Sequence, residues 1–116
     1  MLCAMLSVVL AVAGPSADAQ DDWNQVGADI DGENAYDQSG YSVATNAAGD
    51  TVIIGAPYND GVNGSNAGQA RVFTLTDGVW VQSGADIDGE DANDDSGSSV
   101  AMNAAGDTVI IGAPYN

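Results

Sequence analysis

Apolar and polar positions in this chain follow the short alternating runs of β-strands. Runs rich in β-branched and aromatic residues are bounded by Gly, Asn and Asp, which is typical of strands separated by turns. We expect strands at residues 23–26, 41–46, 51–56, 70–76, 79–83, 98–103 and 108–113, with loops over 57–69 and 84–96. Residues 51–56 are apolar on both faces and predict a covered central strand. Asp77-Gly78 predicts a two-residue hairpin turn.

The chain repeats itself, since Trp23 recurs as Trp80 and the likeness continues to the last residue. Residues 23–59 and 80–116 are identical at 30 of 37 positions. A fixed period of this size is typical of solenoids, propellers and arrays. Four antiparallel strands in each period, joined as a meander, predict a propeller-type blade. We therefore expect an all-β fold of antiparallel four-stranded blades, with fewer than two blades present, as a fragment of a β-propeller array.

Two short motifs occur once in each period. Residues 39–43 (SGYSV) return as 96–100 (SGSSV), and Gly55-Ala56-Pro57 returns as Gly112-Ala113-Pro114. They resemble the FG-x-SV and GAP elements of FG-GAP repeats, which build the N-terminal propeller of integrin α subunits and occur in bacterial surface proteins. The resemblance covers about 23–116 and implies the same propeller fold. Ser39 and Ser96 replace the Phe of the FG element, so an aromatic packing residue is missing.

The N-terminal residues predict export. Residues 1–13 are apolar, and Ala17-Asp18-Ala19 forms a small-x-small cleavage site before Gln20. The run is shorter than the roughly 20 residues that a transmembrane helix needs. We expect a signal peptide and a secreted, extracellular or cell-surface protein; the alternatives are a misassigned start and a short anchor.

These features divide the chain into four parts. Residues 1–19 are the signal peptide, and 20–39 hold an outer strand and an acidic connection. Residues 40–83 form FG-GAP blade 1, and 84–116 form a second connection and an incomplete FG-GAP blade 2.

The charge is strongly negative, with seventeen acidic residues against the single cation Arg71 and a net charge of −16. Nucleic-acid binding and anionic membrane surfaces both require Lys and Arg, so neither is expected. Cations from solution must balance the acids, either at specific sites or along a diffuse solvated surface. We expect Arg71 to form a salt bridge with a nearby carboxylate.

Both acidic connections contain the alternating carboxylates that Ca²⁺ favours. The candidate ligands are Asp29, Asp31, Glu33 and Asp37 in the first connection and Asp86, Asp88, Glu90 and Asp94 in the second. The alternative is a metal-free connection built on Asx-turns, which also accounts for loop 59–64. The resemblance implies calcium loops at 46–50 and 103–107, but these have too few carboxylates to bind it.

Residues 20–116 contain no His, Cys or Lys, and their paired carboxylates lie in Gly-rich loops without the desolvated setting that acid–base catalysis needs. We therefore expect a non-enzymatic structural, adhesion or ligand-recognition module. Its partners would be a protein or carbohydrate ligand, further repeats of a longer chain, or another copy paired through an open strand edge. That edge would be strand 108–113, exposing Val109, Ile110 and Ile111. The alternative is the non-catalytic propeller of a larger exported enzyme, such as a carbohydrate-active one.

Overall fold

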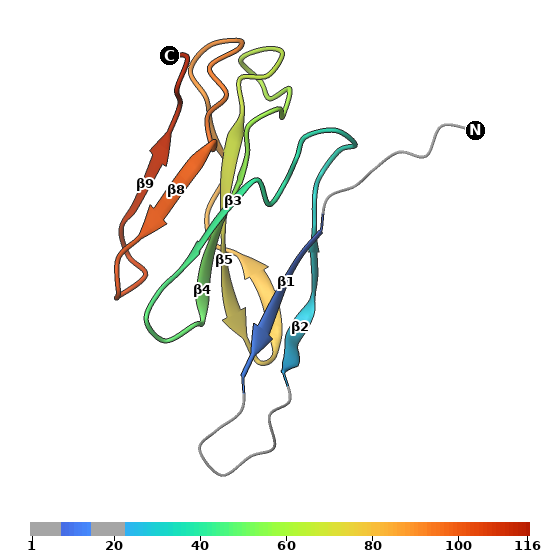
Figure 1. Ribbon diagram of the computed structural model, residues 1–116, viewed down its shortest axis with the longest axis vertical. Helices are drawn as coiled ribbons and strands as arrows, with labels where there is room; N and C mark the ends of the chain where they lie inside the picture. The colour runs from blue at the N-terminus through green and yellow to red at the C-terminus, as the bar shows by residue number, and fades with distance from the viewer. Residues whose placement is uncertain (1–7, 15–22) are drawn as a thin grey trace, which may run out of the picture.

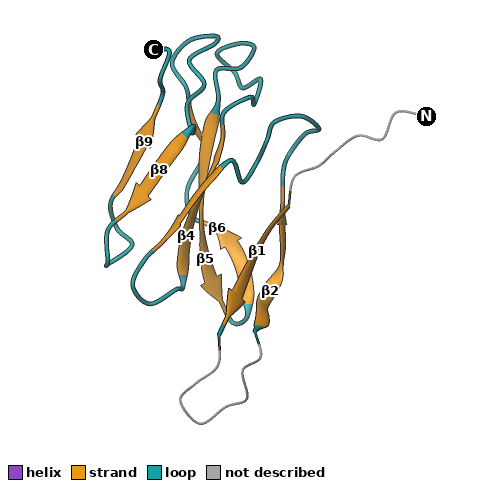
Figure 2. Cartoon of the chain, viewed as in Figure 1, coloured by secondary structure: helices purple, strands orange, loops and turns teal. Residues whose placement is uncertain are grey.

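The computed structural model describes residues 8–14 and 23–116, which form β-strands joined by turns and loops (Figures 1 and 2). The strands are β1 (Val8–Ala13), β2 (Asn24–Asp31), β3 (Ser42–Thr45), β4 (Thr51–Ala56), β5 (Gln69–Thr76), β6 (Val79–Gln82), β7 (Ile87–Asp88), β8 (Ser99–Met102) and β9 (Val109–Gly112). This confirms the all-β prediction. Among the described residues, no helix is long and apolar enough to cross a membrane.

The central sheet is one complete blade. Strands β3, β4, β5 and β6 pair antiparallel in chain order, and β7 pairs with β5 beyond the end of β6. Asp77 and Gly78 both have positive φ, as the predicted hairpin turn requires. β4 is covered on both faces, because Ile53 and Ile54 point in opposite directions and are 0% and 1% exposed.

A partial blade lies on each side of this sheet (Figure 1). On one side β8 pairs with β9 in the register of β3 with β4, and β8 contacts β3 and β4. On the other side β1 pairs with β2. The core cluster of Ile30, Ile54 and Phe73 joins β2 to the central sheet, with Val9 and Trp80 packed against it.

The structure corrects two predicted loop boundaries. β2 continues to Asp31 instead of ending at residue 26, and residues 87–88 form a strand inside the predicted loop 84–96. The β1–β2 ladder contains an irregularity near Gly27, whose φ is positive, and it resumes at Ile30. β7 resumes pairing with β5 in the same way after the break that follows β6. At both of these breaks the alternation of apolar and polar residues is interrupted. The sequence therefore predicted only the part of each strand that precedes the break.

The predicted signal peptide falls largely outside the described residues. Of its described residues 8–14, residues 8–13 form β1. Residues inside the predicted signal peptide thus pair with β2 as an edge strand in this structure.

The prediction of an apolar open edge is right for one residue of three. β9 pairs with β8 alone among the described strands, and Ile110 is 72% exposed. Val109 and Ile111 are half-buried, because alternate side chains of a strand point to opposite faces.

Candidate functional site

Loops gather at one end of the blades and form a rim (Figure 2). Loop 57–68 and connection 89–98 are joined by main-chain hydrogen bonds, including those from Asn93 N to Ser65 O and from Asp95 N to Asn66 O. Asn66, Asn93 and Asp95 have positive φ, a conformation that Asn and Asp tolerate better than most residues. The Asn- and Asp-rich composition therefore permits two irregular segments to pair closely.

Two predicted metal ligands, Asp37 and Asp94, are buried structural groups. Asp37 accepts a hydrogen bond of 2.8 Å from Asn59 Nδ2, and its main-chain oxygen accepts one from Tyr58 N. Asp94 repeats the arrangement with Asn116 Nδ2 at 3.2 Å. Their exposed fractions are 5% and 4%. These aspartates fasten each acidic connection to the turn that follows the Gly-Ala-Pro motif.

The other six predicted ligands do not form a metal-binding group. The carboxylates of Asp29, Asp86 and Glu33 accept hydrogen bonds from the side-chain amides of Gln25, Gln82 and Gln69, respectively. Asp31 and Glu90 are exposed, and Asp88 lies against Gly61. Asp29, Asp31 and Asp88 lie on extended strands, so neither connection curls into a continuous ligand loop. In residues 8–14 and 23–116, no three carboxylates are grouped closely enough to hold a metal ion.

One shallow cleft on the rim collects acids from three different segments. Its volume is about 380 Å³, and its polar lining includes Glu33, Asp60, Asp86, Asp88, Asn59 and Gln69. Asp60 lies in loop 59–64, whose composition predicts a turn in preference to a weak cation loop, and its carboxylate accepts hydrogen bonds from Asn66 N and Ser65 Oγ. Four acidic residues around one cleft favour a ligand that carries positive charge or hydrogen-bond donors.

The turns at 46–50 and 103–107 are held together by asparagine. Asn46 Oδ1 accepts hydrogen bonds from the main-chain nitrogens of Asp50 and Thr51, each at 3.1 Å. Asn103 does the same for Gly106, Asp107 and Thr108. Hydrogen bonds from Asn103 and then Thr108 lower the pKa of Asp107 below 3.8. In each turn the asparagine side chain thus holds the main chain in place through these hydrogen bonds.

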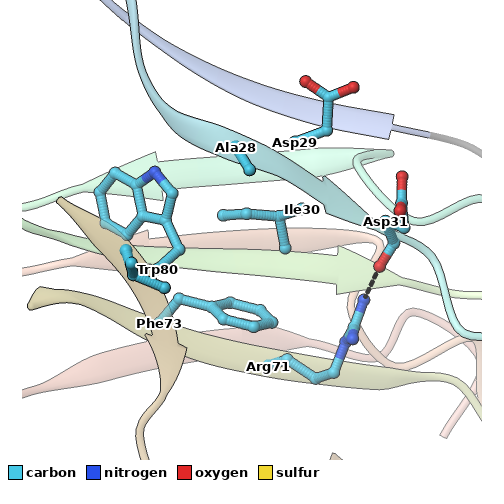
Figure 3. Close-up of a pocket in the computed structure, with 8 residues that line it drawn as sticks. Ala28, Asp29, Ile30, Asp31, Arg71, Phe73 and Trp80 are labelled. Carbon is cyan, nitrogen blue, oxygen red and sulfur yellow. Dashed lines mark hydrogen bonds between the residues drawn. The ribbon is translucent and has the colours of Figure 1, made fainter.

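Arg71 is buried beneath β2 and lines a separate small pocket of about 210 Å³ (Figure 3). Its Nη2 donates to the main-chain oxygen of Asp31 at 2.9 Å and to Ser39 Oγ at 3.5 Å. The guanidinium also lies 5.2 Å from the centre of the Phe73 ring. The expectation of a carboxylate salt bridge is wrong for the described contacts, because the strand places the carbonyl of Asp31, and not its carboxylate, in front of the guanidinium.

The comparisons agree with the motifs and the blade geometry. A protein family described as FG-GAP repeat matches residues 23–73. These residues run from Trp23, directly before β2, to Phe73 in β5, and so include the connection 32–41 and the loop 57–68 of the rim. A search of curated proteins found no match to this chain.

Proposed function

Since residues 23–73 are an FG-GAP repeat, we propose that this protein is a non-enzymatic interaction module whose acidic rim cleft binds a basic segment of a partner protein. The observation that carries the proposal is the convergence of Glu33, Asp60, Asp86 and Asp88 on one cleft. Loops held by a rigid scaffold are common places for recognition, because the scaffold positions side chains without constraining their chemistry.

Electrostatics supports a cationic ligand. Arg71 is the only Lys or Arg of the chain, and it is 7% exposed and hydrogen-bonded beneath β2. The carboxylates of the cleft therefore act on an approaching ligand without a cationic side chain of their own to neutralise them. A field of one sign attracts an oppositely charged partner and raises its association rate, and salt weakens both effects.

Export is part of the same proposal and rests on the sequence of residues 1–19. An extracellular or surface-displayed module could meet partner proteins directly. The detection of the protein outside producing cells, together with its N-terminal sequence, would test this part.

The cleft can be tested with a Lys-rich peptide of about ten residues and a neutral Ser/Gly peptide of the same length. We expect the Lys-rich peptide alone to bind, with an affinity that falls as NaCl rises. The double variant Asp86→Asn/Asp88→Asn should weaken binding by roughly two- to thirtyfold, since each exposed ion pair contributes about 0.2–1 kcal/mol.

Asp77→Asn is the control, and it removes one negative charge where the double variant removes two. Asp77 is an exposed carboxylate in the β5–β6 turn, at the end of the blade opposite the rim (Figure 1). This variant removes charge without touching the cleft. Equal affinities in the double variant and the control would contradict the cleft as the binding site.

A further inference from the structure

The two partial blades are complementary halves of one blade. β8 and β9 correspond to β3 and β4, the first two strands of the central blade, because the residues and the register repeat. β2 corresponds to the fourth strand, β6 with β7, since Trp23 and Ile30 recur as Trp80 and Ile87. The position of β1 within a blade follows from its pairing with β2.

β1 lies in the third-strand position, with the register that β5 has in the central blade. The corresponding pairs are Val8↔Asp31 and Gln69↔Asp88, Val9↔Ile30 and Ala70↔Ile87, Val12↔Gln25 and Phe73↔Gln82, and Ala13↔Asn24 and Thr74↔Val81. Each residue of β1 therefore has one equivalent in β5, although the two sequences differ. The N-terminal half-blade contains strands three and four, and the C-terminal half-blade contains strands one and two.

The two halves cannot join within one molecule. β1 and β2 lie on one side of the central sheet, and β8 and β9 lie on the other (Figure 1). Val9 packs on the cluster that contains Ile54, whereas β8 contacts the sheet from the opposite face. Among the described strands, β9 therefore has no partner on its second edge.

We propose that copies of this chain associate head to tail, with β9 of one copy pairing antiparallel to β1 of the next. The strands β8 and β9 of the first copy and β1 and β2 of the second then form a complete four-stranded blade. The register follows from the β4–β5 pairs, in which Val52, Ile53 and Gly55 lie opposite Phe73, Val72 and Ala70. Translated to the new interface, Val109 lies opposite Val12, Ile110 opposite Ala11, and Gly112 opposite Val9 of the next copy.

The exposure of Ile110 supports this arrangement. Ile53, its equivalent in the central blade, is 0% exposed, because β8 covers the face of the sheet to which it points. Ile110 is 72% exposed, and Val43 of β3 is 55% exposed. A groove of about 260 Å³ lies between β1 and β3–β4 and is lined by Val9, Val43 and Ile54. Pairing of β9 with the next copy's β1 would place Ile110 in that groove.

The tryptophans supply an independent argument. Trp80 donates from Nε1 to the main-chain oxygen of Val26 at 2.8 Å, and its ring covers Gly27, where a Cβ would lie 2.7 Å from the ring. Trp23 is the equivalent residue and is 70% exposed. Gly84, the equivalent of Gly27, has nothing within 4 Å of its Cβ position. In the head-to-tail assembly Trp23 would cover Gly84 of the preceding copy and donate to its Ser83 oxygen.

Each copy contributes one whole blade and two halves, so an assembly contains two blades per copy. A head-to-tail interface closes into a ring when the rotation permits and otherwise continues as a filament. Propellers typically have about four to eight blades, which corresponds to rings of about two to four copies.

The net charge of −16 opposes association, and NaCl screens that repulsion. Assembly should therefore strengthen as NaCl rises, whereas binding of a basic peptide to the rim should weaken.

Disulfide trapping tests the register in the full chain 1–116. In a Cys3→Ser background, Ala11→Cys and Ile110→Cys are made as separate proteins and mixed under oxidising conditions in high NaCl. We expect a disulfide-linked heterodimer, because paired strands bring the two Cα atoms within disulfide range. Ile110→Cys mixed with Val62→Cys is the control, since Val62 is 87% exposed on loop 57–68. A heterodimer yield no higher than this control would overturn the proposal.

Sedimentation gives a second readout that needs no disulfide. The chain has a mass of 11.6 kDa, and we expect concentration-dependent assembly to at least twice this mass in high NaCl. Trp23→Ser should raise the dissociation constant roughly tenfold, because buried aromatic anchors dominate many interfaces. The assembly belongs to the uncleaved chain, because cleavage before Gln20 would remove β1. Removal of residues 1–19 should therefore abolish it. A chain 1–116 that stays monomeric in high NaCl, or assembles equally well without residues 1–19, would refute the proposal.

Discussion

Asparagine side chains organise much of the irregular backbone in this chain. Asn46 and Asn103 bind the main-chain nitrogens of their own turns, while Asn59 and Asn116 bind the buried carboxylates of Asp37 and Asp94. An asparagine amide offers both a donor and an acceptor, so one side chain satisfies groups of both kinds. The connections are thereby ordered through hydrogen bonds within each repeat.

Replacement of Asn59 by alanine should destabilise the fold. The change leaves the 5% exposed Asp37 carboxylate without its side-chain donor, and an unsatisfied buried group costs about 1–3 kcal/mol or more when charged. Urea unfolding of the full chain would measure the loss. Asn34→Ala, at an exposed position of the same connection, is the control. Equal stabilities of the two variants would show that the Asn59–Asp37 contact contributes nothing.

The Asp107 turn should depend on pH in a definite direction. Its folded pKa lies below 3.8 because Asn103 and Thr108 donate to the carboxylate. The contribution of these hydrogen bonds is present above the ordinary pKa and is lost as the pH falls through the lowered folded value. Carboxyl-carbon NMR titration would measure this pKa. In Asn103→Ala it should move back toward 3.8, and a wild-type value at or above 3.8 would contradict the interpretation.

At the scale of elements, each strand is stable only when a neighbour covers it. The repeated sequence gives β4 and β9 the same residues, yet Ile53 is buried and Ile110 is exposed. Position in the stack of blades, and not residue type, therefore decides how much each isoleucine contributes. The two residues form a matched pair for measuring that difference.

Ile53→Ala should cost about 2–5 kcal/mol, the range for truncating a buried isoleucine. Ile110→Ala should cost much less in a dilute, low-salt solution, where the copies are separate and Ile110 stays 72% exposed. Unfolding curves under these conditions would compare the two. Similar losses of stability would mean that Ile110 is already covered in the isolated chain.

At the scale of the whole molecule, negative charge dominates. The seventeen acids repel one another, and any cation relieves the repulsion. Five of the eight predicted calcium ligands accept hydrogen bonds from side-chain amides, which favours diffuse screening over coordination. The two possibilities differ in their response to salt.

Melting temperatures in high NaCl, measured with Ca²⁺ and with a chelator, would distinguish diffuse screening from calcium coordination. We expect equal melting temperatures, because NaCl replaces Ca²⁺ in screening. A coordinated site would instead add RT ln(1 + [L]/Kd), about 2.7 kcal/mol at a hundredfold excess over Kd. A calcium shift that persists in high NaCl and disappears in Asp86→Ala or Asp88→Ala would establish the calcium hypothesis.

The sequence by itself determined the blade. Alternating apolar residues, the Asp77-Gly78 turn and the repeated Gly-Ala-Pro motif are local signals, so the strand order β3-β4-β5-β6 followed from them. The repeat also predicted that β8 and β9 would copy β3 and β4. These features depend on backbone preference and on side-chain alternation, which neighbouring residues specify.

Only the tertiary structure decided which distant residues meet and how residues 8–13 pair. Asp37 meets Asn59 and Arg71 meets the Asp31 carbonyl across 22 and 40 residues of sequence, and the cleft joins three separate segments. An apolar run such as residues 8–13 suits a leader peptide or a strand equally well, because both need the same side chains. Its register on β2 comes from hydrogen bonds between backbones, which carry no signature in the sequence of either strand.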